Sequence, residues 1–382
     1  MIADEEISQS LMFDTVRRFV REKLVPLEFD VAQNDRVPEE IIQEMRDLGL
    51  FGITIPEAYG GLGLSSSQEA SVVMELGWTS PAFRSVVGTT IGIGSQGIVM
   101  DGTLEQKMEF LPKMANGEVT ASFCLTEPEA GSDASSLKTT AVLKNNHYSI
   151  TGSKRYITNA RHAGVLTVMA RTDPAEPGAK GITAFIVDSS SPGITIGKKD
   201  EKMGQRGTVT SDVFFDEVIV PRDRIIGGVP GRGFITAMKV LDRGRIHIGA
   251  LCVGTAKRLI NESLAYAKER QQFGKPIADF QLIQAMLADS QAECYAAETM
   301  VFDAAKRFDN GEKITMQASC CKMYASEMVG RVADRAVQIF GGAGYMAEYG
   351  IERFFRDVRL FRLYEGTTQI QQLIIAKEMM RL

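Results

Sequence analysis

Proline is distributed unevenly along the 382-residue chain, and this distribution restricts the fold more than any other feature. No proline occurs between Gly231 and Lys275, and none follows Pro276. An interior proline breaks a helix and costs about 3 kcal/mol, so windows without proline permit long helices. We therefore predict a C-terminal region of long helices, two of which end at Asn310-Gly311 and at Gly341-Gly342.

The rest of the chain contains two regions with different periodicity. Residues from about 5 to 115 carry apolar side chains at helical spacing, such as Val16, Phe19 and Val20. Between about 120 and 225, short runs rich in Val, Ile, Phe and Thr are separated by Gly and Pro, which is typical of strands. We predict an α+β fold made of an N-terminal helical domain (1–118), a central antiparallel β domain (119–228) and a C-terminal helical bundle (229–382).

Composition excludes several classes of protein. The formal net charge is -5 and the sequence pI is about 5.5, which argues against a nucleic-acid binder, because such proteins need an excess of Lys and Arg. No run of about 18 apolar residues is present, so no membrane span is expected. The first residues, MIADEEISQS, lack the basic and apolar parts of a signal peptide, and we expect a cytoplasmic protein.

Cysteine and histidine give no sign of a disulfide framework or a metal site. The five cysteines show no CxxC spacing, and free thiols in a reducing compartment are the simplest interpretation. His147, His162 and His247 lie far apart, without an HExxH motif, so we expect no catalytic metal.

Three segments carry residues that suit a cofactor or a reaction, although each also has an ordinary interpretation. CLTEPEAGSDASS offers Gly131, Ser132 and Asp133 to a pyrophosphate or a ribityl group, or forms a polar turn. GSKRYITNA sets an aromatic residue beside Thr158, whose hydroxyl could reach a flat heterocycle. LYEGTTQIQ has Glu365 just before a helix, where a carboxylate is often only a favourable contact with the helix dipole.

Taken together and in order, five segments resemble the signatures of the acyl-CoA dehydrogenase family: LTEPEAGSD, KRYITNA, ERQQFGKPI, QIFGGAGYMAEYGIERFFRD and LYEGTTQIQ. The resemblance extends over essentially the whole chain. It implies an N-terminal helical domain, a central β domain and a C-terminal four-helix bundle, with FAD held between the β domain and the bundle.

The same resemblance implies a set of cofactor contacts. Within one chain these are Phe123, Leu125, Thr126, Ser132, Tyr156, Thr158, Thr367 and Gln369. The family most often has Trp at the position of Tyr156, so the flavin packing differs there. A neighbouring subunit is expected to contact FAD through Arg270, Phe273, Gln281, Gln338, Gly341 and Gly342. An obligate homo-oligomer, usually a tetramer, follows from this; the alternative for Arg270 and Phe273 is helix-end packing within one chain.

The implied reaction removes two hydrogens across the α and β carbons of an acyl thioester. Glu365 would take the α proton while hydride passes from the β carbon to flavin N5. Hydrogen bonds from the Glu365 backbone N–H and a ribityl hydroxyl would stabilise the enolate-like charge on the thioester. Desolvation would raise the glutamate pKa toward the working pH. Some relatives place the base where this chain has Gly244, which cannot act, and this strengthens the assignment of Glu365.

Substrate contacts are expected at Arg84, Ser132, Asp242, Arg245, Tyr364 and Gly366. LDRGR resembles a segment that contacts CoA, although Asp242 and Arg245 could instead be an exposed helical charge pair. Arg84 resembles an arginine of the glutaryl-CoA dehydrogenase branch, where it would clamp a distal carboxylate; a surface or interface ion pair is the alternative. A related desulfinase branch has a similar arginine but lacks the glutamate base.

The sequence also bears on decarboxylation and on other activities of the same scaffold. The acid that accompanies decarboxylation falls at Gly77, with Glu75 two residues away, so decarboxylation is doubtful. An acyl-CoA oxidase, a flavin monooxygenase and a non-catalytic acyl-CoA-binding flavoprotein are alternatives on the same scaffold. A nicotinamide dehydrogenase would need a strand followed by GxGxxG, of which PGRGFIT is only a fragment. As the electron acceptor we expect an electron-transferring flavoprotein.

Overall fold

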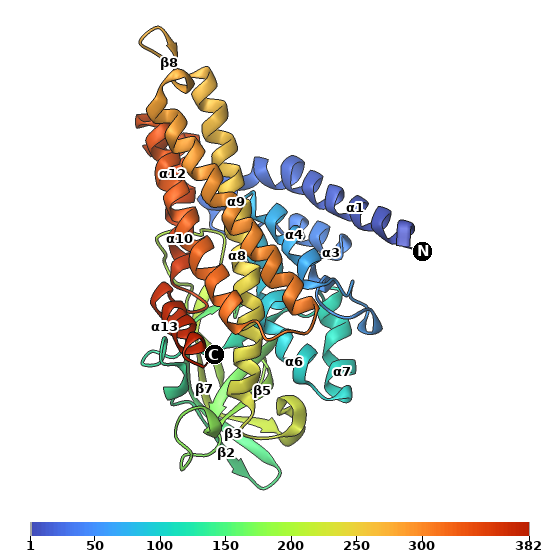
Figure 1. The fold of residues 1–382 in the computed structure, drawn as a ribbon. Coiled ribbons are helices and arrows are strands. Elements are labelled where there is room, and N and C mark those ends of the chain that lie inside the picture. Colours follow the sequence, from blue (N-terminus) through green and yellow to red (C-terminus); the bar gives the residue numbers. More distant parts are fainter. Residues whose placement is uncertain (1, 382) are drawn as a thin grey trace.

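The computed structural model describes residues 2–381, and within them the chain forms three parts in the predicted order. Figure 1 shows the helical bundle standing above the β domain, with the N-terminal helices packed against its side. The predicted helical, β and helical sequence of domains is thus confirmed. None of the helices described in this range is long and apolar enough to cross a membrane.

The N-terminal part is a layer of mostly short helices whose apolar faces share one core. Ser65 and Thr103 begin two of these helices with capping boxes. In each box the hydroxyl accepts a hydrogen bond from the backbone N–H of a glutamine three residues later, and the side chain of that glutamine accepts one from the backbone N–H of the capping residue. A π-helical turn, η5 (Thr90–Gly94), separates two others. The helices are α1 (Ile2–Phe19), α2 (Glu28–Asn34), α3 (Glu39–Asp47), α4 (Ser66–Gly77), α5 (Pro81–Thr89), α6 (Gln96–Asp101) and α7 (Leu104–Ala115).

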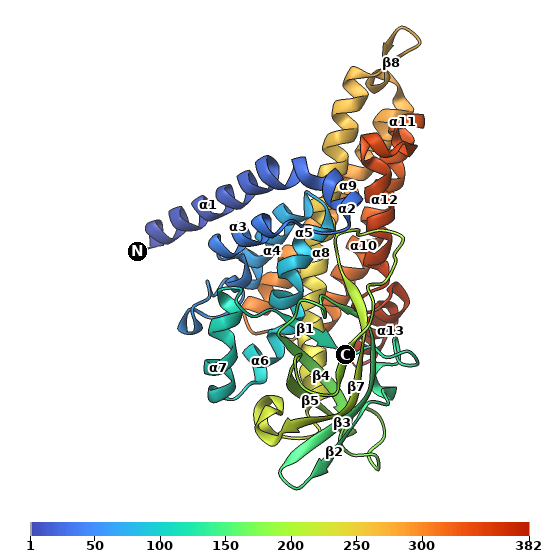
Figure 2. The same cartoon turned by 180° about the vertical axis from the view of Figure 1, so that it is seen from behind.

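The central part is a curled seven-stranded sheet, visible at the lower end of the molecule in Figure 2. Its order is β1-β4-β2-β3-β7-β6, with β5 paired to β4. Most pairs are antiparallel as predicted, but β1 and β2 each run parallel to β4. The strands are β1 (Ala121–Cys124), β2 (Thr140–Lys144), β3 (His147–Thr158), β4 (Val165–Arg171), β5 (Ile182–Asp188), β6 (Ile194–Ile196) and β7 (Thr210–Pro221).

The C-terminal part is built on α8 (Gly233–Glu269), whose 37 residues span about 55 Å at 1.5 Å per residue. Its lower end packs on the sheet and its upper end reaches the hairpin of β8 (Gln271–Gln272) and β9 (Lys275–Pro276), as Figure 1 shows. Small buried residues along α8 let neighbouring helices approach closely. Those helices are α9 (Gln281–Asp309), α10 (Thr315–Phe340), α11 (Gly342–Tyr345), α12 (Ile351–Val358) and α13 (Thr368–Met379).

Candidate active site

A cavity of about 330 Å³ lies where the three parts meet. The β domain forms one wall, and α5, the first turns of α8 and the loop before α13 form the other. The residues expected to contact flavin that line it are Phe123, Leu125, Thr126, Ser132, Tyr156 and Thr158. Those expected to contact substrate are Arg84, Ser132, Arg245, Tyr364, Glu365 and Gly366. The structure therefore gathers most of the predicted site around one cavity.

A buried ion pair holds the wall that follows β1. The Lys154 ammonium lies 2.7 Å from the Glu127 carboxylate, and both side chains are almost completely buried. The same carboxylate accepts from the backbone N–H of Thr139 at 3.0 Å, and Lys154 also donates to the Leu125 carbonyl at 3.2 Å. The segment from Leu125 to Ser132 is thereby fixed at the cavity edge. The sequence motif marked this segment but not the pair that holds it.

Tyr156 reaches the cavity from an irregular point of β3. The pairing of β3 with β7 shifts between Lys154 and Ile157, and Tyr156 has a φ of +59°. Such a bulge re-aims a side chain that would otherwise follow the alternation of the strand. The ring is 59% exposed, with the Arg155 guanidinium 4.9 Å from its centroid. An open aromatic face beside the hydroxyl of Thr158 is suited to a flat heterocycle.

Glu365 faces this wall from the opposite side of the cavity. Its Oε2 atom is buried and has no hydrogen-bond partner, although the residue as a whole is only partly buried. Burial raises the pKa of the Glu365 carboxyl, while nearby Arg84, Lys322 and Arg245 oppose the rise. A desolvated carboxylate without a hydrogen-bond partner at Oε2, on a residue that lines a cavity, is suited to act as a general base.

Gly244 of α8 leaves the space that this carboxylate occupies. A Cβ atom built at Gly244 would overlap Glu365 Oε2. The two positions therefore exclude each other, and glycine on α8 is needed for the glutamate to lie where it does.

Arg84 also lines the pocket and has no carboxylate within ion-pair distance among the described residues. It projects from α5, is 8% exposed and donates to the Tyr364 hydroxyl at 3.1 Å. Its Nε atom is buried without an acceptor. Gly88, one turn along α5, makes room for the side chain, because a Cβ there would overlap it.

Arg245 and Asp242 form a pair on one side of α8. Asp242 accepts from Arg245 and, at 2.7 Å, from the Thr315 hydroxyl. Burial raises the pKa of Asp242, and Arg245 partly offsets it. Arg245 lines the cavity, whereas Asp242 does not, so within one chain the carboxylate acts as a support for the arginine.

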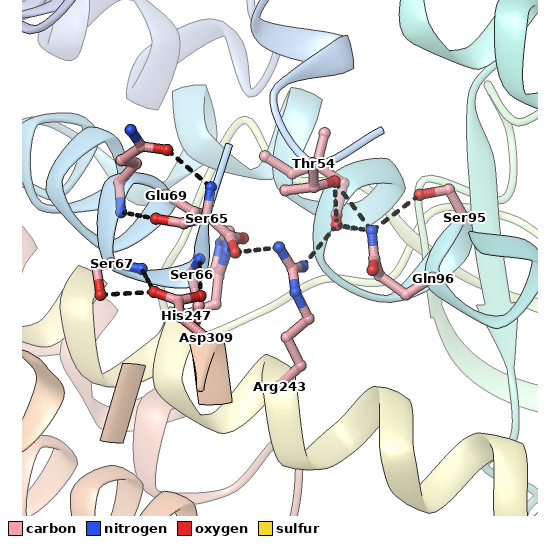
Figure 3. A network of polar contacts seen from close by, with 12 residues as sticks. Thr54, Ser65, Ser66, Ser67, Glu69, Ser95, Gln96, Arg243, His247 and Asp309 are labelled. Atoms are coloured by element: carbon pink, nitrogen blue, oxygen red, sulfur yellow. Dashed lines mark hydrogen bonds and ion pairs between the residues drawn. The ribbon is translucent and has the colours of Figure 1, made fainter. Parts of the chain in front are cut away.

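Figure 3 shows a polar network, centred on Glu69, Arg243 and His247, that the sequence did not reveal. Glu69 of α4 pairs with Arg243 and lies 2.8 Å from His247 Nδ1, all three being buried. Burial lowers the pKa of His247, while the hydrogen bond with Glu69 opposes this change. Arg243 also donates to the Ile91 carbonyl, which belongs to η5. The sequence signal for this network was the presence of charged residues within otherwise apolar helices. Their partners could not be predicted, because the pairing of Glu69 with Arg243 and His247 depends on how α4 packs against α8.

Thr54 and Gln96 extend the network to the other side of η5. The Gln96 amide donates to the Thr54 hydroxyl and to the Ile91 carbonyl, each at 2.9 Å. A π-helical turn leaves carbonyls with irregular partners, and side chains here satisfy one of them. The network thus stabilises the irregular turn that brings Ile93 to the cavity.

Another set of predicted cofactor residues lies far from the cavity, at the tip of the bundle. There Tyr266 near the end of α8 stacks on Phe340 at the end of α10, with ring centroids 4.1 Å apart. Phe273 in the β8–β9 hairpin is 93% exposed. The exposed members of this tip cluster are Arg270, Phe273, Gln281, Gln338, Gly341 and Gly342. One chain therefore does not bring them to its own cavity.

The remaining predicted residues lie at the start of α13. Thr367 is its N-cap and accepts from the Ile370 N–H at 3.3 Å, while Gln369 is exposed. Two supports of the preceding loop, Lys322 and Gln371, were absent from the sequence-based predictions. Gln205, in the loop before β7, also lines the cavity and was not anticipated.

The acid expected near Arg84 in a decarboxylating enzyme is absent from the described cavity wall. Gly77 packs against α8, where an added Cβ would overlap the Leu251 carbonyl. Glu75 lies on the outer side of α4 and pairs with Arg17 and Arg21, each at 3.0 Å.

Comparison with known proteins gives matches along nearly the whole chain. Family models described as the acyl-CoA dehydrogenase N-terminal, middle and C-terminal domains match residues 6–118, 122–218 and 231–380. The caffeyl-CoA reductase–Etf complex subunit CarC of Acetobacterium woodii is 39% identical, over 96% of this chain and 97% of its own.

Solved structures agree with these matches. Butyryl-CoA dehydrogenase from Megasphaera elsdenii superposes with a TM-score of 0.94 and 36% identity, covering 98% of each chain. A glutaryl-coenzyme A dehydrogenase in complex with glutaryl-CoA superposes with a TM-score of 0.93 and 34% identity, covering 98% of this chain and 95% of that one.

Proposed function

The chain belongs to the acyl-CoA dehydrogenase family of FAD-dependent oxidoreductases, and on that basis we propose that it converts an acyl-CoA thioester to the trans-2-enoyl-CoA. Glu365 is the proposed base for the α proton. The observation that carries the assignment is a buried Oε2 without a hydrogen-bond partner, on a residue that lines the cavity.

The cavity wall suits FAD, the cofactor of this family. Phe123, Leu125 and the open ring of Tyr156 would hold the isoalloxazine, while Thr126 and Ser132 would bond its polar groups. An added Cβ at Gly131 would meet nothing within 4 Å, so backbone approach there is unhindered. When bound, FAD supplies the acceptor for the hydride that leaves the β carbon.

Proton removal requires the pKa of Glu365 and the pKa of the α C–H group of the thioester to be brought closer together. A carboxylate near its ordinary pKa is a weak base, and burial raises the pKa of Glu365. Within the described residues, the Glu365 backbone N–H has no hydrogen-bond acceptor, so it is free to donate to the thioester carbonyl. That bond would stabilise the negative charge that develops on the oxygen as the α proton leaves.

We propose that the acyl group is short and ends in a carboxylate held by Arg84. The support is a buried guanidinium whose only hydrogen-bond partner among the described residues is the Tyr364 hydroxyl. A buried guanidinium with no carboxylate in direct contact is unfavourable, and a bidentate carboxylate would satisfy it. The protein related in structure that was solved with glutaryl-CoA is consistent with such a substrate. No acid accompanies Arg84 at Gly77, so we do not propose decarboxylation.

Electrons are proposed to pass to an electron-transferring flavoprotein, as the name of the Acetobacterium woodii relative suggests. That relative is named a reductase, so reduction of an enoyl-CoA is a second candidate; Glu365 would then return a proton to the α carbon. A homotetramer with each flavin completed by a neighbour is proposed from the exposed tip cluster. The cytoplasmic location remains a prediction.

An anaerobic bleaching panel tests the acyl group. Purified holoenzyme is mixed with glutaryl-, butyryl-, octanoyl- and branched acyl-CoAs, and flavin absorbance is followed. We expect glutaryl-CoA to bleach fastest, and Arg84→Met to slow it about 10- to 100-fold, the worth of a hydrogen-bonded charge contact. Arg17→Met, which alters an exposed arginine, is the control. Equal bleaching by neutral acyl-CoAs that Arg84→Met leaves unchanged would refute the anionic substrate.

Stopped-flow reoxidation distinguishes the acceptor. A dehydrogenase is expected to react slowly with oxygen after reduction and quickly with an electron-transferring flavoprotein. Fast reoxidation by oxygen would instead indicate an oxidase or a monooxygenase.

A further inference from the structure

The loop that carries Glu365 has an unfavourable backbone conformation. Glu365 has a φ of +52° and Gly366 a φ of +91°, so two consecutive residues occupy the left-handed region. This region is disfavoured for residues other than glycine. Such a conformation persists only where the surroundings hold it.

Two side chains from different helices hold the loop by its carbonyl groups. Lys322 of α10 donates from Nζ to the Gly366 carbonyl at 2.7 Å. Gln371 of α13 donates from Nε2 to the same carbonyl at 3.0 Å and to the Glu365 carbonyl at 3.1 Å. Both side chains belong to residues with 0% exposure. The carbonyl of each left-handed residue is therefore anchored by a buried side chain.

Lys322 also contributes charge to the site. Burial lowers the pKa of its ammonium to about 8, and Glu365 is among the groups that oppose the change. The ammonium in turn counteracts the rise in the pKa of Glu365. The other charged or titratable groups that act on this pair come from α4, α5, α8, α10 and the preceding loop: Glu69, Arg84, Arg245, Cys252, Glu327 and Tyr364.

We propose that Lys322 and Gln371 form a clamp that positions Glu365 for proton removal. The inference rests on the proposed function, because it concerns the same carboxylate. Neither residue lines the cavity, so the clamp acts through the loop and not on the substrate.

A positioning role differs from a purely structural one in its effect on stability. The folded-state pKa of Lys322 is lower than the ordinary 10.5, so the unfolded chain binds the proton more readily between pH 8 and 10.5. Stability therefore rises with pH across that window, and the burial penalty is fully present below pH 8. Replacing the lysine by methionine removes this penalty and is not expected to lower the melting temperature, whereas activity is expected to fall.

The test is single-turnover flavin reduction, under anaerobic conditions, in the Lys322→Met holoenzyme. We expect the rate constant at saturating glutaryl-CoA or butyryl-CoA to fall about 10- to 100-fold, because a displaced base costs that much. The dissociation constant of the substrate should change by less than about threefold, because the variant removes no contact with the bound substrate. The acid limb of the pH profile should move to higher pH. Lys257→Met, which removes a lysine that pairs with Glu298 away from the cavity, should match the wild type.

Gln371→Met probes the clamp from α13 and keeps the proposal testable if Lys322→Met does not fold. It should slow flavin reduction without loss of FAD and without moving the acid limb, because it removes no charge. A rate constant within about twofold of wild type in the folded variants would overturn the clamp. A fall in the rate constant would also overturn the clamp if both variants lost FAD and melted at a lower temperature, because that result would indicate a purely structural role.

Glu365→Gln in the same assay separates the two proposals. If it abolishes flavin reduction while Lys322→Met and Gln371→Met do not slow it, only the clamp is wrong. If Glu365→Gln still reduces flavin normally, the proposed function of that residue is wrong.

Discussion

The surroundings of Glu365 and the tip cluster of the bundle were both predicted to contribute to one active site. The first region is enclosed within one chain, whereas the second is exposed. Around Glu365, helices from all along the chain enclose the carboxylate, and its loop is anchored by Lys322 and Gln371. At the tip, Phe273 is 93% exposed and lies in a short hairpin. The difference is that one chain by itself encloses Glu365 and the charged groups near it, whereas the predicted cofactor contacts at the tip are exposed and lie apart from that chain's own cavity.

Among the variants that leave Glu365 itself in place, the largest effect is expected from Gly244→Ala, which disturbs the enclosed surroundings of the carboxylate. The added Cβ would overlap Glu365 Oε2 and displace the carboxylate. We expect flavin reduction to slow at least about 100-fold, because displacement by about 1 Å has that effect. FAD content should stay normal, as measured by absorbance. Gly311→Ala lies in open space at a bundle loop and, despite its φ of +75°, should retain the wild-type rate. A wild-type rate in Gly244→Ala would mean that the base is elsewhere.

Glu127→Gln tests the wall that faces Glu365. It leaves the buried Lys154 ammonium without its carboxylate, and removing one partner of a buried pair costs about 3–5 kcal/mol. We expect weaker FAD retention and a lower melting temperature, measured by gel filtration of the holoenzyme and by thermal unfolding. Glu217→Gln, which affects an exposed pair with Lys144, is the control. Unchanged FAD binding would show that the pair does not support the cavity wall.

Phe273→Ala tests the exposed side of the comparison. If a second copy covers this ring, its loss removes about 1.5–3 kcal/mol of apolar burial, or roughly a tenfold to hundredfold change in association. We expect lower FAD content and dissociation at higher protein concentration, measured by light scattering. Phe29→Ala removes another exposed ring, on α2, and should leave both unchanged. An unaffected assembly would remove the support for a flavin shared between subunits.

The smallest effect concerns pH and stability. The pKa of Glu365 is higher in the folded protein than its ordinary value of 4.5. The folded state therefore becomes less stable relative to the unfolded state as the pH rises from about 4.5 through the folded-state pKa, because the buried carboxyl must ionise. Glu365→Gln should therefore raise the melting temperature at neutral pH, and the difference should vanish below about pH 4. Glu75→Gln, on the outer side of α4, should not raise it. An equal melting temperature at neutral pH would contradict a buried, charged Glu365.

Local features of the fold could be predicted from the sequence, whereas contacts between distant segments could not. Long helices followed from proline-free windows, because helix formation depends on local residues. The parallel pairing of β1 with β4 could not be predicted, since strand partners depend on how distant segments meet. Segments with a motif, such as those of Tyr156 and Glu365, pointed to the cavity.

The supports of the site were missed for the same physical reason. Lys322 lies on α10, far along the chain from the loop it holds, and nothing in its own segment marks the contact. Glu69 and Arg243 look like ordinary helical charges until α4 packs on α8. A residue that donates, accepts or lines a cavity can leave a motif, whereas a residue that positions another becomes visible only after packing.

The most direct test of the central claim is anaerobic reduction of the flavin by acyl-CoA in Glu365→Gln holoenzyme. The glutamine keeps the shape of the side chain but cannot accept the α proton. A positioned general base contributes about 10²- to 10⁴-fold, so we expect the rate constant of bleaching to fall by at least that range while FAD and substrate remain bound. Bleaching at the wild-type rate would contradict the assignment of Glu365 as the base.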